Sequence, residues 1–252
     1  MCDLQDMNIK VIDNHWNMTP NKSLSVAIAK RHLAEFVYDA VKLEGINFTL
    51  PEIQTLIDGV TIGGHTLADQ QIAINQSNAW RVLFELISTG KFSLSAKVTC
   101  KLHAVAGKEE SLEFGCFRSG NVTIAGTDYM PPEAVVLPSL FEKMINDAYQ
   151  IEDIYDRAIH TFLTIARCQF FYDVNKRIGR LIMNGILLNH GYPAINVLSK
   201  RQLEFNQLML DYYSSNNQNP MNKFLRSCLD KRIVKIVKES VSNGQNKKPT
   251  LS

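Results

Sequence analysis

The chain of 252 residues lacks three features that would each point to a class of function. It has no apolar run near the roughly 18 residues that a membrane-spanning helix needs. It has no N-terminal stretch in which basic residues precede an apolar segment, the pattern of a secretory signal. Its net charge of +2 gives no general electrostatic case for binding DNA or a membrane surface. We therefore expect no nucleic-acid partner and no membrane partner.

Cysteine is also scarce and shows no metal-like spacing. The odd number of cysteines suits reduced thiols, so we expect a soluble, cytoplasmic protein. Cys168 abuts the most informative stretch of the chain, but no His–acid pair can be identified for it. We interpret Cys168 as a buried structural thiol. The five cysteines are Cys2, Cys100, Cys116, Cys168 and Cys228.

Apolar residues make up 45% of the chain and charged residues 21%, which is ordinary for a globular domain. Apolar positions recur mostly at helical spacing, so the pattern predicts an all-α fold. We expect an N-terminal arm over residues 1–22, one helical domain over 23–241 and a disordered tail over 242–252. The predicted helices are 23–43, 51–57, 68–87, 91–105, 133–149, 152–167, 178–189, 200–212 and 221–241.

The most informative stretch is residues 169–180, Q-F-F-Y-D-V-N-K-R-I-G-R. It precedes an apolar helical segment, so Asp173 and its neighbours are expected at the N-terminus of a largely buried helix. Free N–H groups and the positive end of the helix dipole favour an anion there. Arg177 and Arg180 are three residues apart and share one helix face. Asp173 offers a carboxylate suited to Mg²⁺. These residues predict a pocket for a metal-bound polyphosphate, while a capped helix with two solvated arginines is the simpler alternative.

This stretch resembles the signature H-P-F-x-D-G-N-G-R-x-x-R of the Fic family, and its N-K-R resembles the Doc relatives of that family. Most polar positions of the signature match, at Asp173, Asn175, Arg177 and Arg180. The histidine of the family falls on Gln169. The resemblance implies an all-α Fic-like domain with one small β-hairpin. It also implies that ATP and Mg²⁺ are used to transfer AMP to a hydroxyl of a target protein.

The resemblance assigns roles to residues of the loop. Nucleotide binding falls on Asn175, Lys176, Arg177 and Arg180, and the metal falls on Asp173. The family's histidine acts as general base, which typically contributes 10²–10⁴ in rate. Gln169 cannot accept a proton at neutral pH, so we expect weak or absent transfer. No other histidine is identified as a replacement base, and we interpret His103 as a hydrogen-bonded core residue.

A second departure leaves the reaction open. Val174 and Lys176 replace the two glycines of the signature, which removes the freest backbone positions of the anion site. Lys176 resembles the Doc variant, whose members bind the nucleotide in the reverse sense and transfer phosphate. Three interpretations follow. They are a weak protein adenylyltransferase, a non-catalytic Fic-fold module that binds a nucleotide or a peptide, and a Doc-like phosphotransferase.

Two further segments extend the resemblance. Residues 117–127 are predicted to form a hairpin similar to the Fic flap, on which an extended target segment docks by strand addition along Val122, Thr123 and Ile124. A second copy of the chain is an alternative occupant, which would give a homodimer. Residues 40–45, A-V-K-L-E-G, resemble the family's inhibitory motif [S/T]-x-x-x-E-[G/N], with alanine at the first position. There Glu44 would pair with Arg180 and occupy the place of the γ-phosphate.

Overall fold

The computed structural model describes residues 12–245, with side chains described as far as residue 240. This part of the chain is helical and contains no β-sheet, so the predicted all-α class is confirmed. The α-helices are α1 Lys22–Arg31, α2 Leu33–Leu43, α3 Leu50–Ile57, α4 Leu67–Ser88, α5 Ala96–Ala106, α6 Leu137–Tyr149, α7 Ile154–Cys168, α8 Asn175–Asn189, α9 Gln202–Ser215, α10 Asn219–Ser227 and α11 Lys231–Gln245. Short 3₁₀ helices precede α6 and α9, at Ala134–Val136 and Ser199–Arg201.

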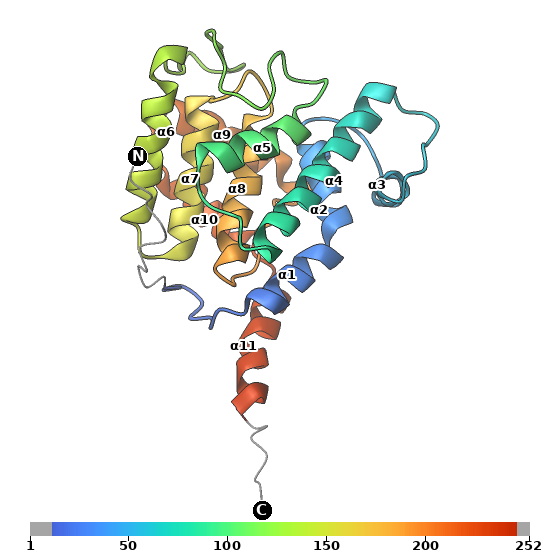
Figure 1. The fold of residues 1–252 in the computed structure, drawn as a ribbon, viewed down its shortest axis with the longest axis vertical. Coiled ribbons are helices and arrows are strands. Elements are labelled where there is room, and N and C mark those ends of the chain that lie inside the picture. Colours follow the sequence, from blue (N-terminus) through green and yellow to red (C-terminus); the bar gives the residue numbers. More distant parts are fainter. Residues whose placement is uncertain (1–11, 246–252) are drawn as a thin grey trace, which may run out of the picture.

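The predicted division into arm, domain and tail stays a prediction. Residues 1–11 and 246–252, which hold half of the arm and most of the tail, lie outside the described residues. Helix α11 continues to Gln245, past the predicted end of the domain at residue 241. It projects from the lower end of the helical body in Figure 1. None of the described helices combines the length and the apolar character needed to cross a bilayer.

Helix α8 lies at the centre of the body, packed along α7 and also against α4, α5 and α1 (Figure 1). Gly179 allows the close approach to α7, because a Cβ there would lie 2.7 Å from a ring carbon of Phe162. Almost every residue of α8 is buried, including Arg177 and Arg180 in its first two turns. Two arginines in a nearly apolar helix are costly unless an anion accompanies them.

Most helices begin and end near their predicted positions. Thr49 caps α3 in a capping box with Glu52, and Pro51 lies in the first turn. The predicted helix over residues 23–43 is divided at His32, whose Nδ1 bonds to the carbonyl of Ile28. Residues 228–230 divide the predicted helix over 221–241 into α10 and α11.

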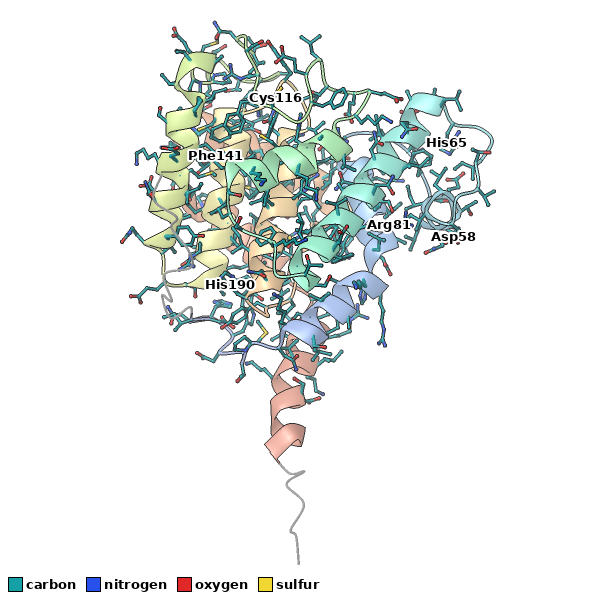
Figure 2. All side chains as sticks on the ribbon, in the orientation of Figure 1. Asp58, His65, Arg81, Cys116, Phe141 and His190 are labelled. Atoms are coloured by element: carbon teal, nitrogen blue, oxygen red, sulfur yellow. The ribbon has the colours of Figure 1, made fainter. Side chains whose placement is uncertain are left out.

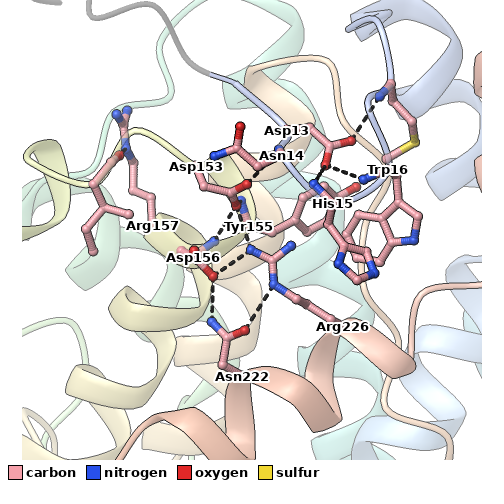
Figure 3. A network of polar contacts seen from close by, with 12 residues as sticks. Asp13, Asn14, His15, Trp16, Asp153, Tyr155, Asp156, Arg157, Asn222 and Arg226 are labelled. Carbon is pink, nitrogen blue, oxygen red and sulfur yellow. Dashed lines mark hydrogen bonds and ion pairs between the residues drawn. The ribbon is translucent and has the colours of Figure 1, made fainter.

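A polar network fixes the N-terminal end of α7, the end remote from Gln169 (Figure 3). Asp153 caps α7 and also accepts the backbone N–H of Asn14 at 2.9 Å, which fastens the N-terminal arm to the helix. Arg226 from α10 pairs with Asp153 at 2.7 Å and with Asp156 at 2.5 Å. Its Nε donates to Asn222 at 3.0 Å. Three separate segments are therefore held together at this end of α7.

The predicted hairpin over residues 117–127 is not formed. In the described part of the chain, the only β-type pairing is an isolated bridge between Ile12 and Asp153. A bend at residues 119–120 and a turn at residues 125–126 leave only four residues, 121–124, between them, and a hairpin with strands this short is marginal without further strands. The segment is instead an open loop that lies in the upper part of Figure 2, near the labelled Cys116.

Aromatic side chains anchor residues 169–175, called the signature loop below, in the core. Phe170 and Phe171 are fully buried, and both contact the ring of Phe117 at the start of the open loop. Phe170 also contacts the ring of Phe141 in α6. Side chains fill the space between the helices throughout, as Figure 2 shows around Phe141. The apolar half of the loop is therefore anchored in the core, and its polar half faces outward.

Candidate functional site

The signature loop contains two residues with unusual backbone conformations. Gln169 ends α7 with φ 49° and Val174 precedes α8 with φ 65°, both in the left-handed region. A buried, β-branched valine with positive φ is rare because its side chain crowds the backbone. Such residues cost on the order of 1–3 kcal/mol and persist only where the surroundings enforce them. The loop is therefore held in shape by neighbouring contacts.

Asn175 supplies one of these contacts from inside the loop. Its Oδ1 accepts the N–H of Phe171 at 2.9 Å, and its Nδ2 donates to the carbonyl of Phe171 at 2.7 Å. Nδ2 also donates to Oε1 of Gln169 at 2.9 Å, while Nε2 of Gln169 donates to the carbonyl of Ala166 at 2.5 Å. Both ends of the Gln169 amide are thus engaged within the protein.

Arg118 holds the loop from the outside and was missed by the sequence analysis. Its buried guanidinium donates from Nε to the carbonyl of Gln169 at 2.6 Å and from Nη1 to that of Gly120 at 2.6 Å. Nη2 donates to the carbonyl of Pro132. The Arg118 backbone N–H bonds to the carbonyl of Phe170 at 2.9 Å. One side chain therefore ties the end of α7 to Gly120, within the open loop, and to Pro132, beyond it.

His103 of α5 holds the other side of the loop. Its ring stacks on Phe171 with centroids 3.8 Å apart. Nδ1 accepts the N–H of Gly115 at 3.1 Å, so the proton of the neutral ring lies on Nε2, which donates to the carbonyl of Asp173 at 3.3 Å. Burial lowers the pKa of His103 to about 4. The interpretation of His103 as a hydrogen-bonded core residue is confirmed.

A cavity of about 480 Å³ opens in front of the loop. Three predicted site residues of the loop, Gln169, Asp173 and Lys176, line it, and Thr123 and Ile124 line it from the open loop. The remaining lining residues are Ala125, Tyr172, Asn206, Met209, Leu210 and Tyr213. The structure therefore brings the predicted metal ligand and two residues of the predicted docking segment to one cavity. Arg177 and Arg180 are buried and do not line it.

The cavity offers Mg²⁺ a single carboxylate ligand, Asp173. Asp173 is exposed, and no cluster of three or more candidate ligands occurs among the described residues. A single carboxylate is the kind of protein ligand that Mg²⁺ accepts when substrate phosphates and waters complete its shell. Asp173 could therefore hold the ion only together with a bound polyphosphate.

The start of α8 offers unused hydrogen-bond donors. Val174 caps the helix without a side-chain bond, and no described residue accepts the backbone N–H groups of Asn175, Lys176 and Arg177. The buried Nε and Nη1 of Arg177 and Nη1 of Arg180 also lack a partner among the described residues. Buried donors without acceptors are costly. An anion at this helix terminus would satisfy them.

Glu44, at the C-terminal cap of α2, lies against this cluster. Its carboxylate is 3.0 Å from Nζ of Lys176 and 3.5 Å from Nη2 of Arg180. Burial alone would raise the pKa of Glu44, but Lys176, Arg180 and Arg177 together lower it below its ordinary value. Glu44 is therefore ionised at neutral pH and neutralises cations that an anionic ligand would use. Its predicted pairing with Arg180 is present, and Lys176 is an additional partner.

A second carboxylate, Glu110, was missed by the sequence analysis. Glu110 follows α5 and forms an ion pair with Arg177, whose side chain is only 3% exposed. In the sequence, Glu110 belongs to a Lys-Glu-Glu run before a turn, and nothing distinguishes it from a solvated charge. Only the fold places it beside α8.

The sequence is similar to a known protein family and to several named proteins. Residues 93–187 match the model of the Fic/DOC family. The chain is 26% identical over 212 residues to the Protein adenylyltransferase Fic of Drosophila willistoni, over 79% of this chain and 40% of that protein. It is 24% identical over 212 residues to the Protein adenylyltransferase Fic of Drosophila melanogaster, over 79% and 41%. The chain thus spans about two fifths of the length of these curated relatives.

Two solved structures share the architecture. Fic-1 from C. elegans aligns with a TM-score of 0.72 and 16% identity, over 92% of this chain and 69% of that one. A Fic domain-containing signaling protein from Bacteroides thetaiotaomicron aligns with a TM-score of 0.71 and 18% identity, over 89% and 92%. At these identities, the likeness establishes the fold.

The arrangement of the helices in the described part of the chain is therefore that of the Fic fold. The resemblance found in the sequence is confirmed, because residues 93–187 match the model of the Fic/DOC family and proteins named as Fic adenylyltransferases are similar to the chain.

Proposed function

We propose that the chain is a protein adenylyltransferase of the Fic type, with weak or no activity in its present sequence. One observation carries the proposal. Asp173 and Lys176, at the start of α8, line one cavity, and the first two turns of the same helix carry two buried arginines with unpaired donors. Relatives over this region are named protein adenylyltransferases, which supports ATP as the substrate.

In this proposal, the chain binds the nucleotide through its charge and its free donors. The unpaired N–H groups of α8, together with Lys176, Arg177 and Arg180, hold the phosphates once Glu44 has moved away. Asp173 would hold Mg²⁺, which would supply charge neutralisation at the phosphate oxygens. The side chain of Asn175 is already committed to Phe171 and Gln169, so its contribution is the shape of the loop.

The transfer step needs a proton acceptor. The target hydroxyl oxygen bonds to the α-phosphorus, the bond from that phosphorus to the bridging oxygen breaks, and pyrophosphate leaves. The hydroxyl proton must pass to a base, and a carboxamide such as Gln169 is not one at neutral pH. The Gln169 amide is moreover occupied by Ala166 and Asn175. This engagement also favours the second candidate, a non-catalytic module that binds a nucleotide without transferring it.

Glu44 would keep the resting site closed. It occupies Lys176 and Arg180, and the lowered pKa of its carboxyl means that it stays charged at physiological pH. We propose that this contact lowers the affinity for Mg–ATP.

The expected cytoplasmic location agrees with the free thiols found at all four cysteines in the described region, and it stays a prediction.

Restoring the base tests the reaction. Gln169→His should raise labelling from α-labelled ATP by about 10²–10⁴, the range of a general base. The control is Gln169→His combined with Asp173→Asn, which should lose the gain because the metal ligand is removed. Transfer of the γ-label would instead support the phosphotransferase suggested by Lys176. Strong α-labelling by the unmodified protein would contradict the assignment of Gln169 as the cause of low activity. If no form labels but Mg–ATP binds, the binding-module function is supported instead.

A further inference from the structure

Two carboxylates from distant segments neutralise the cations at the start of α8. Glu44 follows α2 and contacts Lys176 and Arg180, whereas Glu110 follows α5 and contacts Arg177. Each cation of the loop thus already has a carboxylate partner in the protein. The sequence resemblance assigns an inhibitory role to Glu44 and none to Glu110.

The Glu110–Arg177 pair satisfies neither partner fully. The second carboxylate oxygen of Glu110, Oε2, is buried and has no hydrogen-bond donor among the described residues. Arg177 likewise keeps Nε and Nη1 without acceptors. A buried ion pair stabilises a fold only when its remaining lone pairs and protons are also satisfied. An anion with more oxygens, such as a phosphate group, could therefore replace Glu110 as the partner of Arg177.

Glu110 also has room to withdraw. It lies in a turn in which the N–H groups of Glu110 and Ser111 bond to the carbonyl of Gly107, at 3.2 and 2.9 Å. Glu109 adopts φ 63° in this turn, a left-handed conformation that non-glycine residues rarely adopt. On its other side, the turn borders a cavity of about 510 Å³ that Glu110 itself helps to line. The carboxylate can therefore leave Arg177 without displacing a helix.

The charges at the site indicate what withdrawal would achieve. With both glutamates in place, Lys176, Arg177 and Arg180 face three carboxylates, because Asp173 is the third. With both withdrawn, the cations exceed the remaining carboxylate by two charges, which matches the dianionic Mg–ATP complex. With Glu44 alone withdrawn, Glu110 would still oppose the phosphates, and a like charge at a binding site reduces affinity.

We propose that Glu110 is a second inhibitory carboxylate that withholds Arg177 from the nucleotide phosphates and must leave it for tight Mg–ATP binding. This inference rests on the proposed nucleotide function. It predicts two independent contacts to be broken, one on each side of the helix terminus. The alternative role for Glu110 is to position Arg177 for the phosphate, and its loss would then weaken binding.

The test is calorimetric titration with Mg–ATP in a Glu44→Gly background, where the first contact is absent. Adding Glu110→Gln, which removes the charge and keeps the shape, should tighten binding about tenfold. Adding Glu109→Gln instead should change nothing, because Glu109, one residue away, pairs among the described residues with the exposed Lys108 alone. Glu110→Asp, with a shorter reach and the charge retained, should give an intermediate gain and covers the case in which Glu110→Gln unfolds.

The outcomes separate the two claims. Unchanged or weaker binding in both Glu110 variants, with Glu44→Gly still binding Mg–ATP, would overturn the role of Glu110 and leave the proposed function standing. If no variant binds Mg–ATP, the proposed function fails and the inference fails with it. An equal gain from Glu109→Gln would attribute the effect to general surface charge and would also overturn the proposal.

Discussion

The two walls of the candidate site are built in opposite ways. Residues 169–175 form one wall, in which Asn175, Arg118 and His103 bond to the backbone and enforce two left-handed residues. Residues 119–132 form the other wall, and within the described chain no backbone-to-backbone hydrogen bond is made along Val122 to Ile124. The first wall is fixed by side chains from three elements, whereas in the second wall Arg118 holds the carbonyls of Gly120 and Pro132 and leaves Val122 to Ile124 without backbone pairing among the described residues.

This difference suggests a division of roles. A phosphate site needs donors held in place before the ligand arrives, because positioning and electrostatics dominate phosphoryl-type transfer. A docking segment instead needs free backbone groups that an extended partner can pair with. We therefore expect changes in the first wall to alter stability and changes in the second wall to alter target recognition.

The largest expected effect is on stability, through His103. Its pKa is lowered to about 4 from an ordinary value of 6.5. The unfolded chain therefore takes up a proton below pH 6.5, and the folded chain does so only near pH 4. The contribution of His103 is fully present above pH 6.5 and is lost as the pH falls toward 4. The expected loss in unfolding free energy is about 3 kcal/mol.

Denaturant unfolding at pH 7 and pH 4 measures this loss. The comparison is with His103→Gln, whose amide can still accept from Gly115 and donate to Asp173 but does not titrate. The difference in stability between the two pH values should be smaller in the variant, since all other groups are shared. Equal pH dependence in both proteins would show that His103 is not buried in its neutral form.

A smaller effect is expected from the second wall. Thr123→Pro removes one backbone donor, and a single hydrogen bond contributes about 0.5–1.5 kcal/mol. In the Gln169→His background, target labelling should slow several-fold while Mg–ATP affinity stays unchanged. Thr123→Val, which keeps the N–H group and loses the hydroxyl, is the control. Labelling at an unchanged rate with Thr123→Pro would argue against docking along this segment.

Several parts of the site could be predicted from the sequence because they depend on local spacing. Helical periodicity predicted a buried helix just after Asp173, and α8 is that helix, although it begins at Asn175, three residues before the predicted range of 178–189. Both arginines lie in the first two turns of this helix. The contact of Glu44 with Arg180 could be predicted only through resemblance to the family, since the two residues are 136 positions apart.

Other parts could not be predicted, for physical reasons. Alternation and turn residues around Val122 suggested a hairpin, but strand pairing depends on a partner that the sequence does not specify. Glu110, Arg118 and His103 reach the loop through tertiary packing, so their local sequence carries no sign of it. The engagement of Gln169 with Asn175 likewise depends on the left-handed conformation at residue 169.

The central claim is that the start of α8 is an anion site held closed by Glu44. Calorimetric titration of Mg–ATP against the unmodified protein, Glu44→Gly and Glu44→Gln tests it most directly. Both variants should bind Mg–ATP more tightly than the unmodified protein, because each frees Lys176 and Arg180. Only Glu44→Gly also changes the backbone freedom at residue 44, so a gain in both variants is due to the lost carboxylate. Equal affinity in all three proteins, or binding in none, would contradict the claim.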